Sequence, residues 1–156
     1  MNTQRPYIFL FKITLFSFIL SVLPFNEIIL DVSPFWMLLL YTYWLVYFPA
    51  KGSLFIALIL GSLLDILQGD ILGQNALALI LASIFINNVK QSFRVSNLST
   101  QQVYVFTSSG IYLTFYFLTH LLMHGINVNY YLLLAPLTGA ILWPVVRFSL
   151  AKCRHQ

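Results

Sequence analysis

The sequence predicts an all-α integral membrane protein, a bundle of six transmembrane helices. The chain of 156 residues is 60% hydrophobic and only 8% charged, whereas a soluble domain carries roughly a quarter charged residues. Its mean hydropathy is +0.86. Apolar stretches close to the length of a membrane-spanning helix, about 20 residues, recur from end to end. Together these observations exclude a soluble globular domain.

Clusters of polar residues, Pro and Gly divide the apolar stretches from one another. The third stretch is short enough that a re-entrant hairpin is an alternative to a full crossing. Six helices of about 20 residues leave about three dozen residues for loops and tails, so we expect a single polytopic domain over residues 1–156. The predicted helices are 7–23, 34–48, 53–67, 71–89, 103–123 and 130–150.

The distribution of charge favours six crossings with both termini in the cytoplasm. If all six segments cross, every basic residue lies on one side, as the positive-inside rule expects. A re-entrant third segment would instead move the five basic residues from Lys90 onward to the outside. The acidic Glu27, Asp31 and Asp70 lie on the opposite side. The basic residues are Arg5, Lys12, Lys51, Lys90, Arg94, Arg147, Lys152 and Arg154.

The net charge of +4 follows from this topology, so we expect the lipid bilayer and no nucleic acid as a partner. The single cysteine, Cys153, allows no internal disulfide and no thiolate metal site. The sequence has no Gly-x-Ser-x-Gly motif and no Gly-rich phosphate loop. Its four carboxylates are scattered over the chain. We therefore expect neither an enzyme nor a cofactor.

Asp65 is the only acid inside a predicted helix, and an ionisable group there needs a partner or a proton. It belongs to a stripe of small residues spaced by four, which would let another backbone approach closely. One interpretation is a buried site for a substrate, a proton or a partner. The other is that Asp65 accepts hydrogen bonds from backbone N–H groups where the chain reverses and the next helix begins. The stripe is Ala57, Gly61, Asp65, Gly69 and Gly73.

Three further features have both a functional and a structural interpretation. His120 and His124 stand four residues apart, as two metal ligands on one helix face would, but no third ligand is near. The polar stretch 90–102 could dock a cytoplasmic partner or form a solvated connection. Trp143 and Pro144 lie inside the last predicted helix, where a tryptophan is more often a packing residue and a proline usually kinks the helix.

Three stretches make the chain resemble the rod shape-determining protein MreD family of bacterial inner-membrane proteins. The first runs from Pro34-Phe35-Trp36 to Tyr43-Trp44 and Pro49. The second is Gly61-x-x-x-Asp65-x-x-x-Gly69-x-x-Leu72-Gly73-x-x-Ala76-Leu77. The third is Gly139-x-x-Leu142-Trp143-Pro144 with Arg147. Where similar proteins often carry Asn just before the last-helix Gly, this chain has Thr138.

The resemblance implies a non-enzymatic membrane scaffold of the cell-elongation complex that maintains rod cell shape. It implies binding to the bitopic protein MreC, and through it a link between MreB filaments and the peptidoglycan synthases of the lateral wall. It also suggests a distant likeness to the six-helix substrate-binding subunits of energy-coupling-factor transporters, and hence the alternative of a small-molecule binding or transport module. The candidate packing or partner-interface residues are Gly61, Asp65, Gly69, Gly73, Trp143, Pro144 and Arg147.

Overall fold

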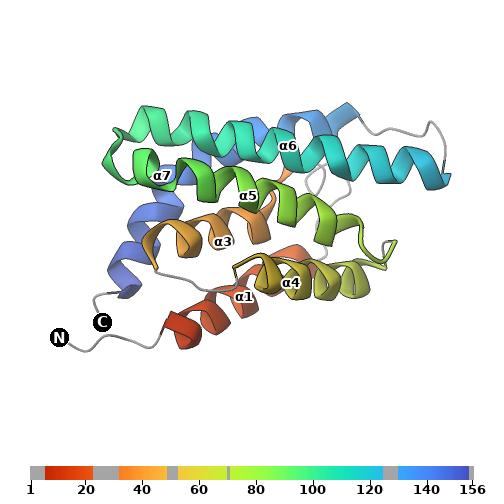
Figure 1. Cartoon of the computed structure of the whole chain (residues 1–156), viewed down its shortest axis with the longest axis horizontal. Coiled ribbons are helices and arrows are strands. Elements are labelled where there is room, and N and C mark those ends of the chain that lie inside the picture. Colours follow the sequence, from red (N-terminus) through yellow and green to blue (C-terminus); the bar gives the residue numbers. More distant parts are fainter. Residues whose placement is uncertain (1–5, 23–31, 49–52, 70, 125–129, 155–156) are drawn as a thin grey trace.

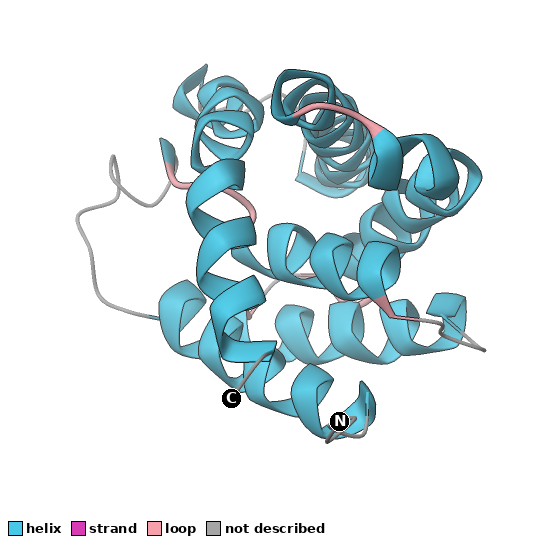
Figure 2. Ribbon diagram, turned by 90° about the vertical axis from the view of Figure 1, so that its left-hand side faces the viewer, coloured by secondary structure: helices cyan, strands magenta, loops and turns pink. Residues whose placement is uncertain are grey.

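The computed structural model describes residues 6–22, 32–48, 53–69, 71–124 and 130–154. These residues form helices and short connections, without strands (Figures 1 and 2). The all-α class and the six predicted helices are confirmed. The elements are α1 (Pro6–Val22), α3 (Trp36–Tyr47), α4 (Ser53–Gln68), α5 (Gln74–Val95), α6 (Leu98–His124), the 3-10 helix η1 (Tyr130–Leu134) and α7 (Ala135–Arg154).

Two helices run further than the hydropathy predicts. α5 continues to Val95 and α6 begins at Leu98, so the prediction of a loop over 90–102 is wrong. Lys, Arg and Gln are good helix formers, and the side chains of Phe93 and Gln101 are fully buried between the helices. The polar stretch is therefore mainly two helix ends.

Among the described residues, three helical segments have the length and composition to cross a membrane, namely α5, α6, and α7 together with η1. The other three are apolar but shorter. The twelve residues of α3 rise about 18 Å, less than the ~30 Å thickness of a hydrocarbon core.

The short helix α3 forms the centre of the bundle. Every side chain from Met37 to Val46 is buried, because α1, α5, α6 and α7 all pack against it. In Figure 1, α3 lies between the pair α1 and α4 and the pair α5 and α6. A helix that is apolar on all sides is buried in this way.

The carboxyl end of α3 lies where α1 begins and α5 ends. The Phe9 ring of α1 packs against the ring of Phe48, with centroids 5.0 Å apart. From α5, Lys90 Nζ donates to the Phe48 carbonyl at 3.2 Å, and Arg94 Nε donates to the Val46 carbonyl. Both cations thus satisfy carbonyl groups at the negative end of the α3 dipole. We call this the basic end of the bundle; in Figure 1, α1 begins and α7 ends there.

Gly61 permits the closest approach between α4 and α5. A Cβ atom at this position would lie 2.3 Å from Ala76 Cα and 2.6 Å from Ala76 N. Ala57 and Asp65, one turn away on either side, are also buried. This part of the predicted stripe therefore packs against a neighbouring backbone.

The prediction that Gly69 and Gly73 continue the same packing stripe is wrong. Both lie in the connection after α4, with φ of 71° and 99°, and a Cβ atom would meet nothing within 4 Å at either position. Their positive φ, which L side chains rarely adopt, is the reason for glycine here. The stripe ends with α4 because the chain turns at this point.

We expect Gly61→Ala to lower the thermal stability of the purified protein, because the new methyl group must push α4 and α5 apart. Overpacking of this kind costs about 1–3 kcal/mol. Gly110→Ala is the matched control, since that helical glycine has open space around its Cβ position and alanine favours a helix. Thermal unfolding in detergent measures both. Equal midpoints for Gly61→Ala and the wild type would contradict the close approach.

Candidate functional site

The buried Asp65 carboxylate joins the end of α4 to the beginning of α5. Its Oδ2 accepts a hydrogen bond from the Gly73 backbone N–H at 2.8 Å, and its Oδ1 accepts one from the Asn75 N–H at 2.9 Å. The Asp65 side chain is 0% exposed. These are the bonds that the capping interpretation of Asp65 predicts, because the first N–H groups of a helix lack partners within the helix.

Asn75 extends the cap into a polar network that connects three helices. Its Oδ1 accepts a hydrogen bond from the hydroxyl of Tyr112 on α6, and its Nδ2 donates to Gln68 Oε1 on α4 at 3.2 Å. The neighbouring Gln74 donates from Nε2 to the Tyr116 carbonyl of α6 at 3.2 Å. Polar side chains at the start of α5 therefore tie α4, α5 and α6 together.

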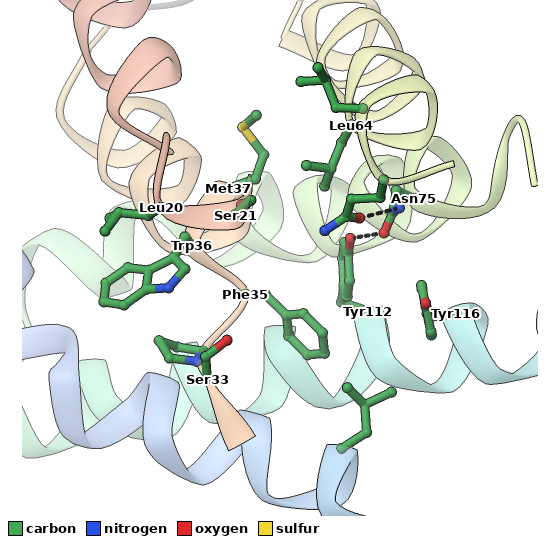
Figure 3. A pocket seen from close by; sticks show the side chains of 14 residues that line it. Leu20, Ser21, Ser33, Phe35, Trp36, Met37, Leu64, Asn75, Tyr112 and Tyr116 are labelled. Atoms are coloured by element: carbon green, nitrogen blue, oxygen red, sulfur yellow. Dashed lines mark hydrogen bonds between the residues drawn. The ribbon is translucent and has the colours of Figure 1, made fainter. Parts of the chain in front are cut away.

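A cavity of about 440 Å³ lies beside this network (Figure 3). It is bounded by the end of α1, the beginning of α3, the end of α4, the start of α5, the middle of α6 and by η1. Figure 3 shows Trp36 on one side, Asn75 and Tyr112 on the other, and Phe35 between them. The Phe35 and Tyr112 rings pack with centroids 4.5 Å apart.

Gln101 organises the basic end of the bundle. Its Oε1 accepts hydrogen bonds from Trp143 Nε1 at 3.1 Å and from Arg147 Nη1 at 2.9 Å. Its Nε2 donates to the carbonyls of Phe93 and Ser96, both at 3.0 Å. One buried amide thus holds the end of α5, the start of α6 and α7 together, and both of its polar atoms have partners.

The candidate residues of the last helix belong to this second network. Trp143 is fully buried, and the Phe93 ring meets it edge-on with centroids 5.4 Å apart. Arg147 is half-buried and binds Gln101 through one nitrogen. Pro144 lies between them, and α7 continues through it. The structure brings Trp143 and Arg147 together, whereas Gly61 and Asp65 lie with the other network.

Thr138 forms a polar contact at the position where the resemblance leads us to expect Asn. Its hydroxyl donates to the Val32 carbonyl at 2.8 Å, and it lies 3.0 Å from the carbonyl of Ala135 in its own helix. The first contact links α7 to the segment before α3. A shorter side chain at this position therefore still connects the two elements.

The remaining candidates are placed as follows. Among the described residues, no group of three His, Cys, Asp or Glu could hold a metal ion. His120 is half-buried on α6, and the side chain of His124 lies outside the described part of the chain, as do Arg5, Lys51, Glu27, Asp31 and Asp70.

Sequence reasoning missed two residues whose side-chain amides join helices, Asn75 and Gln101. Both are amides in or beside stretches of mixed polarity, and Gln101 falls in the segment expected to be a loop. The one sequence signal for their burial was a polar residue at helix spacing from apolar residues. This signal does not distinguish a buried amide from a solvated one.

The fold defines a multi-pass α-helical membrane protein. Residues 1–153 match the model of the rod shape-determining protein MreD family, and the chain belongs to this family. It is 26% identical to the rod shape-determining protein MreD of Haemophilus influenzae over 140 residues, which cover 90% of this chain and 86% of the relative. No solved structure matches it. The family is one of non-enzymatic membrane proteins with a role in determining rod cell shape.

We expect Asp65→Leu to destabilise the bundle, because it leaves the N–H groups of Gly73 and Asn75 without an acceptor in an apolar interior. Each unsatisfied buried donor costs about 1–3 kcal/mol. Asp65→Asn is the matched variant: it keeps the shape and one acceptor oxygen, so its loss of stability should be smaller. Thermal unfolding and the amount of protein in membranes measure the effect. Wild-type values for Asp65→Leu would exclude the cap as a stabilising interaction.

We expect Gln101→Leu to lower stability by a similar amount, since four groups lose their partner at once: two carbonyls, the indole N–H and the Arg147 guanidinium. The adjacent Gln102→Leu serves as the control, because Gln102 is only half-buried. The same thermal measurement compares them. If both variants unfolded at one temperature, the Gln101 network would contribute nothing specific.

Proposed function

We propose that this chain is a scaffold of the bacterial cell-elongation complex in the inner membrane. It binds an MreC-like bitopic protein and helps to couple MreB filaments to the peptidoglycan synthases of the lateral wall. The observation that carries the proposal is the match to the MreD family over residues 1–153. Asp65 at the start of α5 and Gln101 at the basic end hold helices of this chain to one another, as a scaffold requires.

The surface of the bundle supports binding to a second membrane protein. The short helices α1 and α4 are in contact with each other and turn large apolar side chains outward, among them Phe11 and Phe55, each 68% exposed. A bitopic partner offers one apolar helix, and small differences in packing decide such contacts in lipid. Gly61, Asp65 and Trp143 are buried within the chain, so we assign them to internal packing. Pro144 and Arg147 remain candidates for the partner interface.

The orientation in the membrane is part of the proposal. Lys90, Arg94 and Arg147 gather at one end of the bundle through their hydrogen bonds. By the positive-inside rule this end faces the cytoplasm, which puts both termini there and the cavity towards the outer side. We further propose that residues 1–156 form one domain with six crossings, in an arrangement like that of the substrate-binding subunits of energy-coupling-factor transporters.

Depletion of this protein in its native bacterium should turn rods into spheres, because lateral-wall synthesis loses its membrane scaffold. Cell width measured by microscopy gives the result, with wild-type re-expression as the control. Rods of unchanged width, with growth failing only when a nutrient is scarce, would contradict the scaffold and favour the transport module.

The partner is tested separately by affinity purification in mild detergent. An MreC-like protein should be recovered in near-stoichiometric amount with the wild type. The Gln102→Leu variant should recover the same partner, since it leaves the buried Gln101 network intact, and it serves as the control. Loss of MreC under all gentle conditions, with cell shape still dependent on the protein, would exclude direct binding to MreC and leave the role in shape.

A further inference from the structure

We propose that the cavity between α3 and α6 is a binding site for an uncharged small molecule that carries a flat ring system with a hydrogen-bonding edge. This site goes beyond the scaffold function and does not depend on it. The cavity volume of about 440 Å³ lies within the range of roughly 300–1,000 Å³ that is typical of ligand pockets. It is lined from five helices and η1.

The walls offer aromatic surfaces on two sides. Phe35 and Trp36 come from the beginning of α3, and Tyr112 and Tyr116 from the middle of α6. Figure 3 shows Trp36 and Tyr112 at opposite sides of the cavity. Aromatic faces of this kind favour a planar ligand through offset or edge-to-face stacking.

The polar groups of the site are built in and held in place. Asn75 is 2% exposed, yet its side chain forms part of the cavity wall. Asp65 fixes its backbone, while Tyr112 and Gln68 fix its amide. Capping α5 uses only the Asn75 backbone, while its side-chain amide is held at the cavity wall by Tyr112 and Gln68.

Gln68 supplies a donor at the rim. Its Oε1 accepts the bond from Asn75, and its Nε2 group has two N–H donors that can reach a ligand from an exposed side chain. The hydroxyls of Ser21 and Ser33 also line the cavity. Amides held in place between aromatic walls select a ligand with amide or hydroxyl groups.

The described residues of the lining carry no charged side chain. Its side chains are apolar, aromatic, amide or hydroxyl groups. The nearby Asp65 carboxylate is fully buried and accepts two backbone N–H bonds. A phosphate or carboxylate group would meet no positive counter-charge among these residues, which is strongly unfavourable in a low-dielectric site.

Riboflavin and its phosphate test this proposal, because they share one ring system and differ by a charged group. The full chain, in phosphatidylcholine nanodiscs, is titrated into riboflavin while flavin fluorescence is followed. We expect saturable quenching with a Kd below ~1 mM and at least about tenfold weaker binding of the phosphate ester. Trp36→Leu should reduce the quenching and Gln68→Leu should weaken binding by severalfold.

Gln91→Leu is the matched control, because Gln91 is an exposed glutamine at the far end of α5. Unchanged thermal unfolding of each variant establishes that it folds. Absence of saturable quenching, equal binding of both flavins, or equal binding by Gln68→Leu and Gln91→Leu would overturn the proposal. If lipid stayed bound in the cavity and blocked riboflavin, the cavity would be a site for an acyl chain. That outcome would overturn the proposal as well.

Discussion

Polar groups at the helix ends of an apolar bundle must find their partners within the chain, because lipid offers none. The structure meets this constraint with side chains from neighbouring helices. Asp65 on α4 accepts the first N–H groups of α5. Lys90 and Arg94 on α5 donate hydrogen bonds to carbonyl groups at the end of α3. These bonds satisfy groups at a helix end and also join two helices.

The short central helix shows the consequence most clearly. α3 is buried from Met37 to Val46, and the carbonyl groups at its end accept hydrogen bonds from α5. Gln101 does the same for the end of α5, where it binds the Phe93 carbonyl and connects it to Arg147 on α7. The basic residues at this end thus stabilise the fold, in addition to supporting the orientation in the membrane that we propose.

The opposite end combines a rigid polar network with open space. Asp65 and Asn75 hold the start of α5 in place through hydrogen bonds. Beside them, aromatic residues of α3 and α6 line a cavity. The scaffold function that we propose needs a firm internal structure and an outer surface for partners, and it does not require a cavity of this chemistry. The proposal of a ligand therefore rests on this cavity.

The sequence by itself determined the all-α class, the positions of the six helices, the family and the candidate cap at Asp65, because hydropathy, turn residues and spacing are local properties of the chain. Only the tertiary structure decided the ends of α5 and α6, the burial of Gln101 and Asn75, and the different roles of Gly61 and Gly73. The bonds from Gln101 to Arg147 and from Tyr112 to Asn75 join residues 46 and 37 positions apart. Such pairs depend on how helices pack against one another, and a local pattern carries no record of that.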